Sequence, residues 1–109
     1  MFALMAMYVV IGLLLAGLAL PLIQKRIPPN MWYGFRVQKT LSSPDIWYPA
    51  NAYMAKYMLV WGLTIAITSF LFYFIPGIGL DAYVGLCTAV ALGGILIVLV
   101  QGFRYLKTL

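Results

Sequence analysis

Three long runs without a charged side chain are the feature that most constrains what this chain can fold into. The runs cover residues 1–23, 57–80 and 82–103. About 20 consecutive apolar residues, wound into a helix, cross the ~30 Å hydrocarbon core of a bilayer. Only 8% of the residues are charged, whereas a soluble domain carries about 25%. The sequence therefore predicts an all-α membrane protein, with a single domain over residues 1–109.

Turn and helix-end signals divide the chain into three transmembrane helices and one polar loop. The expected spans are about 1–23, 50–75 and 82–103, with the loop over about 24–49. Pro28 and Pro29 are expected to stop the first span, because proline cannot donate a backbone hydrogen bond. Residues 76–79 (Pro-Gly-Ile-Gly) predict a tight turn, and Asp81 is expected to cap the third span. We expect the three helices to form a compact bundle, with a structured cytoplasmic loop between the first two.

The second span has a recognisable start. Ser43 is a candidate N-cap, Pro44 suits the first helical position, and Asp45 lies favourably at the positive end of the helix dipole. Pro49 is expected to kink this helix, or to delay its regular start to about Ala50, because it lacks the N–H of a continuing helix.

Every span carries small residues four positions apart, a spacing that lets another helix approach closely. These residues are Gly12 and Ala16, then Gly62 and Ala66, and finally Gly85, Ala89 and Gly93. The longest run, in the third span, is expected to be the main helix-contact face. Two uses of it stay open: packing within this chain, or the seam of a homo-oligomer.

The distribution of charge predicts an orientation. Four of the seven basic residues lie in the loop and two in the C-terminal tail, whereas the turn before the third span has none. The positive-inside rule places the loop and the C-terminus in the cytoplasm, and the N-terminus and the turn outside. The net charge of +5 is therefore attributed to topology, and no nucleic-acid partner is expected.

The inventory of reactive side chains argues against an enzyme. The chain has no His and no Glu, and its only carboxylates are Asp45 and Asp81. Paired-carboxylate catalysis, nucleophilic triads and multi-ligand metal sites all lack components, so we expect no catalytic residue, metal or cofactor. The single thiol, Cys87, lies mid-span and is expected to be a packing residue. The spans hold no Asp, Glu, Lys or Arg beyond Lys56 near the start of the second, which argues against an ion relay.

Residues 28–57 concentrate aromatic, basic and amide side chains in an otherwise apolar chain. Their pattern resembles the signature of the SdpI/YfhL family of bacterial membrane proteins, carried by Asn30, Trp32, Gly34, Arg36, Thr40, Trp47, Asn51 and Lys56. The likeness covers about residues 28–62. The chain departs from the family pattern at Ala52, where members often carry Arg, and at Ala55, where Gly commonly precedes the Lys.

The resemblance implies a role that composition alone does not. The best-known family members confer immunity against a secreted, membrane-active peptide toxin, and one also signals by holding a transcriptional repressor at the membrane. It therefore implies a multi-pass protein of the bacterial inner membrane whose partners are lipids, a peptide toxin and a cytoplasmic regulatory protein. The eight signature residues are the candidate functional loop. Asn51 and Lys56 are five residues apart, which turns them about 140° from each other on a helix, so they need not serve one site.

Two other functions stay open at this point. The aromatic and basic loop also suits a lipid-headgroup or small-molecule site, in a binding or transport protein. The small-residue face of the third span also suits a packing subunit of a larger membrane complex.

Overall fold

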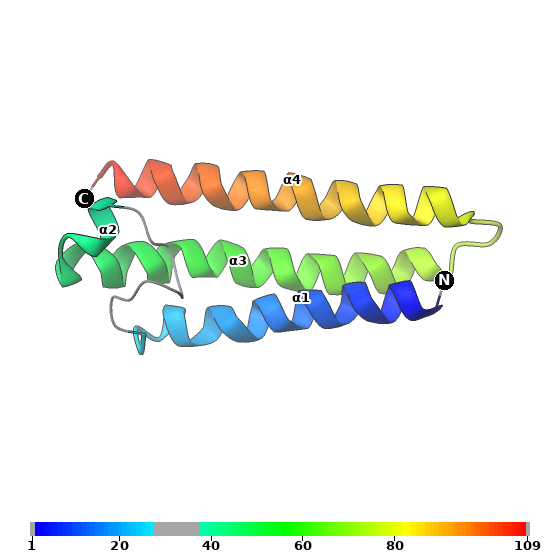
Figure 1. Cartoon of the computed structure of the whole chain (residues 1–109), viewed down its shortest axis with the longest axis horizontal. Coiled ribbons are helices and arrows are strands. Elements are labelled where there is room, and N and C mark those ends of the chain that lie inside the picture. Colours follow the sequence, from blue (N-terminus) through cyan, green and yellow to red (C-terminus); the bar gives the residue numbers. More distant parts are fainter. Residues whose placement is uncertain (1, 28–37, 109) are drawn as a thin grey trace.

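The structure, a computed structural model, describes residues 2–27 and 38–108, which form four helices (Figure 1). Their bounds are α1, Phe2–Ile23; α2, Gln38–Leu41; α3, Pro44–Tyr73; and α4, Leu80–Leu106. The three long helices are candidate membrane spans by length and composition. The molecule is elongated, with extents of 52 × 22 × 18 Å. The predicted all-α fold with three spans is confirmed.

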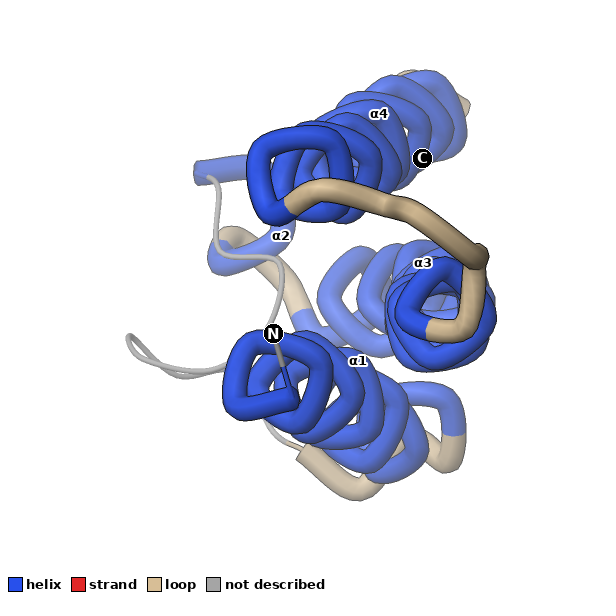
Figure 2. The backbone as a smooth tube through the Cα atoms, turned by 90° about the vertical axis from the view of Figure 1, so that its right-hand side faces the viewer, coloured by secondary structure: helices blue, strands red, loops and turns tan. Residues whose placement is uncertain are grey.

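Helix α3 is the central helix of the bundle (Figure 2). It packs against α1 and against α4, and it runs antiparallel to both (Figure 1). We call the end that holds the last turn of α1, the start of α3 and the last turn of α4 the basic end. The opposite end, where residues 74–79 connect α3 to α4, is called the turn end. Helix α2 contacts α3 at the basic end.

The contact between α1 and α3 is made by the predicted small residues. A Cβ atom built on Gly12 would lie 2.7 Å from the backbone nitrogen of Ala66, and one built on Gly62 would lie 2.8 Å from that of Ala16. Real side chains do not come this close to a neighbouring backbone, so only glycine fits at either position. The two small-residue pairs are therefore each other's partners.

Helix α1 ends differently from the prediction. Its last turn closes in a Schellman motif, in which the Arg26 N–H donates to the Pro21 carbonyl at 2.9 Å and the Lys25 N–H to the Leu22 carbonyl at 3.2 Å. Lys25 takes the left-handed conformation, with φ of 59°. The expectation that Pro28 stops the helix is wrong, because backbone hydrogen bonds have already ended it at Ile23.

The start of α3 follows one prediction and contradicts another. Ser43 is the N-cap, and its hydroxyl accepts a hydrogen bond from the Asp45 N–H at 3.1 Å. The prediction that the helix starts at about Ala50 is wrong, because the helix begins at Pro44 and continues past Pro49 without a break. Pro49 removes a single helical hydrogen bond, and the cap and the buried residues on either side of it offset that loss.

The turn end is tight, as predicted, and Gly77 there has a φ of +75° that favours glycine. Helix α4 begins at Leu80, with the extended Gly79 as N-cap and no side-chain cap. The expectation that Asp81 caps this helix is wrong. Asp81 lies within the first turn, where its charge still complements the helix dipole.

A small core at the turn end joins α1 to α4. Met5, Tyr83 and Cys87 are buried together, and the Tyr83 hydroxyl donates to the Ser69 carbonyl of α3 at 2.9 Å. The expectation that Cys87 is a packing residue is confirmed by its burial, with only 2% of its surface exposed.

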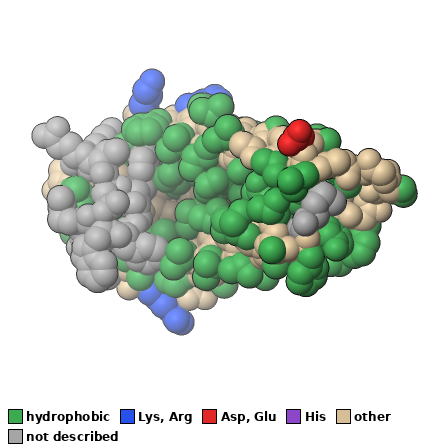
Figure 3. All heavy atoms as spheres, turned by 45° about the vertical axis from the view of Figure 1, so that its right-hand side comes forward, with side chains coloured by type: hydrophobic (Ala, Val, Ile, Leu, Met, Phe, Trp, Pro, Cys, Tyr) green, Lys and Arg blue, Asp and Glu red, His purple; other side chains and the backbone are tan. Residues whose placement is uncertain are grey.

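The outer surface of the helices is apolar, as a lipid-facing surface requires. Large exposed side chains such as Leu14, Ile67 and Leu96 cover it. Figure 3 shows this apolar surface, with Lys and Arg side chains toward one end and an acidic side chain toward the other.

Candidate functional site

Three of the eight signature residues are buried at the basic end. Thr40 lies in α2, while Trp47 and Asn51 lie one turn apart near the start of α3. All three side chains are buried. The other loop candidates, Asn30, Trp32, Gly34 and Arg36, lie outside the described residues.

Trp47 ties the segment after α1 to the start of α3. It has no exposed surface, and its indole N–H donates to the Ile27 carbonyl at 2.8 Å. This hydrogen bond joins residues 20 positions apart. Because Ile27 directly precedes the first residue outside the described part, Trp47 fixes where the candidate loop begins.

Asn51 and Thr40 are buried polar groups in an apolar setting. The Asn51 amide donates to the Trp47 carbonyl at 3.0 Å, and only 2% of the Asn51 surface is exposed. Thr40 is fully buried and also has an interaction partner. Burying an amide or hydroxyl is costly unless it is hydrogen-bonded, so this polar cluster gives the basic end one defined arrangement.

Lys56 stands apart from the cluster. Its side chain is exposed, whereas Asn51 on the same helix is buried. The two side chains therefore lie in different surroundings, and whether they serve one site stays a prediction.

The two departures from the family pattern are both buried alanines of α3. Ala55 is 1% exposed and packs against Ala19 and Leu22 of α1. Ala52 is 7% exposed. A methyl group at position 55 is thus compatible with close contact between α1 and α3.

The predicted contact face of α4 is not used within the described chain. Gly85, Ala89 and Gly93 are all exposed, and no atom comes within 4 Å of a Cβ built on either glycine. The interpretation as packing within this chain is therefore wrong. The neighbouring face of α4 is used instead: a Cβ on Gly94 would meet the Trp61 indole. The spacing of small residues indicates which faces of a helix another helix can approach. Here the bulky side chain of Trp61 determines which face of α4 contacts α3.

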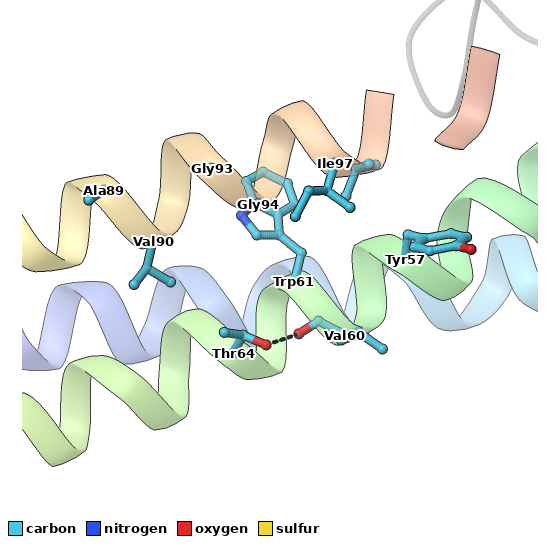
Figure 4. Close-up of a pocket in the computed structure, with 10 residues that line it drawn as sticks. Tyr57, Val60, Trp61, Thr64, Ala89, Val90, Gly93, Gly94 and Ile97 are labelled. Carbon is cyan, nitrogen blue, oxygen red and sulfur yellow. Dashed lines mark hydrogen bonds between the residues drawn. The ribbon is translucent and has the colours of Figure 1, made fainter. Parts of the chain in front are cut away.

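The sequence interpretation missed the contacts that Trp61 and a group of tyrosines make between α3 and α4. The Trp61 indole N–H donates to the Ala91 carbonyl of α4 at 3.0 Å, which joins α3 to α4. Figure 4 shows the Trp61 ring reaching from α3 toward α4 near Gly94. Nearer the basic end, the rings of Tyr53 and Tyr105 stack with centroids 4.1 Å apart, and the Tyr53 and Tyr57 hydroxyls lie 3.4 Å apart. A tryptophan in mid-span, away from the membrane interface where tryptophan is enriched, was the available signal for the first contact.

Fold and site together define a small multi-pass helical membrane protein with a buried polar cluster at its basic end. The model of the SdpI/YfhL protein family matches residues 26–103, and the chain belongs to this family. Comparison with curated proteins and with solved structures finds no match.

Proposed function

We propose that this protein is an immunity protein of the bacterial inner membrane, which protects its cell from a secreted, membrane-active peptide toxin. Membership of the SdpI/YfhL family is the observation that carries the proposal. Three candidate spans and a polar cluster at one end of the bundle support it, because such a protein has to act from within the membrane.

The role is one of binding, not catalysis. The chain has no His, no Glu and only two Asp residues, which leaves few groups able to transfer a proton. In this proposal Trp47 and Asn51 hold the basic end in shape, since both are buried and hydrogen-bonded within the protein. Arg36 is one of two charged signature residues, with Lys56, and it is the one assigned to bind the partner.

Protection is measured by survival. Candidate membrane-active peptide toxins are first sought among the products of the neighbouring genes. A toxin-sensitive bacterium expressing this chain is exposed to each candidate, and its survival is compared with that of cells carrying an empty vector. Survival is expected to rise. Unchanged killing, with the protein present in the membrane in normal amount, would reject immunity.

The role of the loop is tested by charge removal at two positions. Arg36→Gln removes a signature charge, whereas Lys107→Gln removes an exposed charge of the basic end that is outside the signature. Protection is expected to fall at least tenfold for Arg36→Gln and to stay intact for Lys107→Gln. A fluorescent fusion measures membrane abundance in both. Equal protection by the two variants would show that Arg36 does not bind the partner.

Signalling is a separate part of the proposal. A regulator encoded beside the gene, tagged with a fluorescent protein, is expected to move from the cytoplasm to the membrane when toxin is added. A regulator that stays in the cytoplasm while protection is intact would reject signalling and leave immunity standing.

A further inference from the structure

An open groove runs between α3 and α4. It has a volume of about 320 Å³, and its lining includes Tyr57, Trp61 and Thr64 from α3 and Ala89, Gly93 and Ile97 from α4 (Figure 4). The groove exists because Ala89 and Gly93 of α4 have little or no side chain, so space is left between the helices. Next to this space, the Trp61 side chain extends from α3 to contact α4.

The lining offers an apolar surface to its occupant. The Thr64 hydroxyl donates to the Val60 carbonyl at 2.7 Å, and the Trp61 indole donates to the Ala91 carbonyl at 3.0 Å. The Tyr57 hydroxyl is paired with that of Tyr53. Because these polar groups already have partners within the protein, a hydrocarbon fits the groove better than a polar solute.

The groove is open to one side and roomy. Its volume of about 320 Å³ is many times the ~10–15 Å³ that a single water molecule needs in the same measure. A stretch of a lipid acyl chain matches this apolar space, and the charges at the end of the groove favour a lipid over a helix.

Both walls of the groove lead to an exposed cation at the basic end. On α4, Arg104 follows Ile97 by seven residues, which places it on the same side of the helix. On α3, Lys56 precedes the groove residue Val60 by four residues, which places it on the same side of the helix, one turn nearer the basic end. An apolar groove that opens between two cations complements a molecule with a hydrocarbon tail and an anionic head.

Tyrosine side chains lie next to these cations along α3 and α4. Tyr57 lines the groove, and Tyr53 stacks on Tyr105, the residue after Arg104. Tyrosine is enriched at the level of lipid headgroups, because its ring is apolar and its hydroxyl is polar. The three tyrosines therefore mark where a tail would give way to a head.

We propose that the groove between α3 and α4 is a binding site for an anionic phospholipid, with one acyl chain against Trp61 and Gly93 and the phosphate at Arg104 and Lys56. The site is distinct from the buried cluster of Thr40, Trp47 and Asn51. It goes beyond the proposed immunity function and does not depend on it.

The acyl part is tested by filling the groove. Gly93→Leu places a side chain in the groove, and Gly85→Leu places the same side chain on the same face of α4 outside the groove; neither Cβ meets an atom of the described chain within 4 Å. Each protein is reconstituted with phosphatidylglycerol, and bound lipid is counted by native mass spectrometry. Gly93→Leu is expected to lower occupancy at least tenfold, and Gly85→Leu to leave it unchanged. Equal occupancy in the two variants would overturn the site.

The head part is tested by removing charge. The double variant Lys56→Gln and Arg104→Gln is expected to bind phosphatidylglycerol about 30-fold more weakly, from ~1 kcal/mol per cation near an anionic surface. The matched control, Lys25→Gln with Arg26→Gln, removes two exposed cations at the end of α1 and is expected to keep full binding. Wild-type protein is expected to prefer phosphatidylglycerol to phosphatidylcholine, less so as salt is raised.

Three further results would overturn the proposal. Equal binding of phosphatidylglycerol and phosphatidylcholine would show that the site does not recognise an anionic headgroup. Equal loss of binding in both charge variants would show that Lys56 and Arg104 do not bind the phosphate. A dimer mass in the wild type that Gly93→Leu abolishes and Gly85→Leu keeps would assign the groove to a second copy of the chain.

Discussion

At the residue scale, two hydrogen bonds define the start of α3: a local one at Ser43 and a long-range one at Trp47. The Ser43 cap depends on residues two positions apart and forms as predicted. The hydrogen bond from Trp47 to the Ile27 carbonyl joins residues 20 positions apart, and nothing in the spacing of the signature indicates it. Trp47 could thus be singled out as a candidate, but its part in positioning the loop could not be derived without the fold.

Replacing Trp47 with phenylalanine tests that part. Trp47→Phe keeps an aromatic ring, removes the indole N–H and leaves the Ile27 carbonyl without this donor. The variant is expected to lose about 1–3 kcal/mol of stability, because a buried group loses its hydrogen bond and some volume is left unfilled. Thermal unfolding in detergent measures the loss.

The neighbouring residue supplies the control. Tyr48→Phe removes a polar atom from a half-buried side chain next to Trp47 and is expected to change stability by less than about 0.5 kcal/mol. Equal losses in the two variants would show that the indole hydrogen bond does not stabilise the basic end.

At the scale of the helices, the sequence predicted which faces can be approached but not what approaches them. The pairs Gly12 with Ala16 and Gly62 with Ala66 pack against each other. The third run of small residues, which has the most regular spacing, is exposed within the described chain. The difference arises in α3, where Trp61 meets Gly94 and turns the neighbouring face of α4 toward the bundle.

Adding one methyl group to the α1–α3 contact should separate the helices. Gly12→Ala would place its Cβ against the backbone of Gly62 and Ala66, and backbone atoms cannot move aside as a flexible side chain can. A loss of about 1–3 kcal/mol is expected, in the range of overpacked cores. Unfolding of the purified protein in detergent gives the value.

Gly17→Ala is the matched control on the same helix. No atom of the described chain lies within 4 Å of a Cβ at this position, so stability is expected to stay the same or to rise slightly. A similar loss of stability in both variants would show that alanine destabilises α1 by itself, and that the contact with α3 is not the cause.

At the scale of the whole molecule, charge is distributed unequally between the two ends. The described basic side chains, Lys25, Arg26, Lys56, Arg104 and Lys107, lie toward the basic end together with Asp45, whereas Asp81 lies at the turn end. The number and approximate position of the spans followed from the three uncharged runs, because a helix needs about 20 apolar residues to cross the lipid. Pairing of the helices did not follow, because it depends on side-chain shape.

The charge distribution predicts a basic end in the cytoplasm. A reporter enzyme that is active only outside the cytoplasm is expected to give signal when fused at residue 78 and none when fused at residue 38. The reverse pattern would invert the orientation, and signal at both positions would indicate a mixed topology.

The central position of α3 has a consequence for how the protein is made. Helices α1 and α3 leave the ribosome before α4, and the contact through Gly12 and Gly62 belongs entirely to them. This interface can therefore close before α4 has left the ribosome. Helix α4 then joins a finished hairpin, guided by Trp61 in mid-span and by Tyr83 at its first turn. A chain of residues 1–79, held on the ribosome through a linker long enough to clear the exit tunnel, should already carry a folded pair of helices.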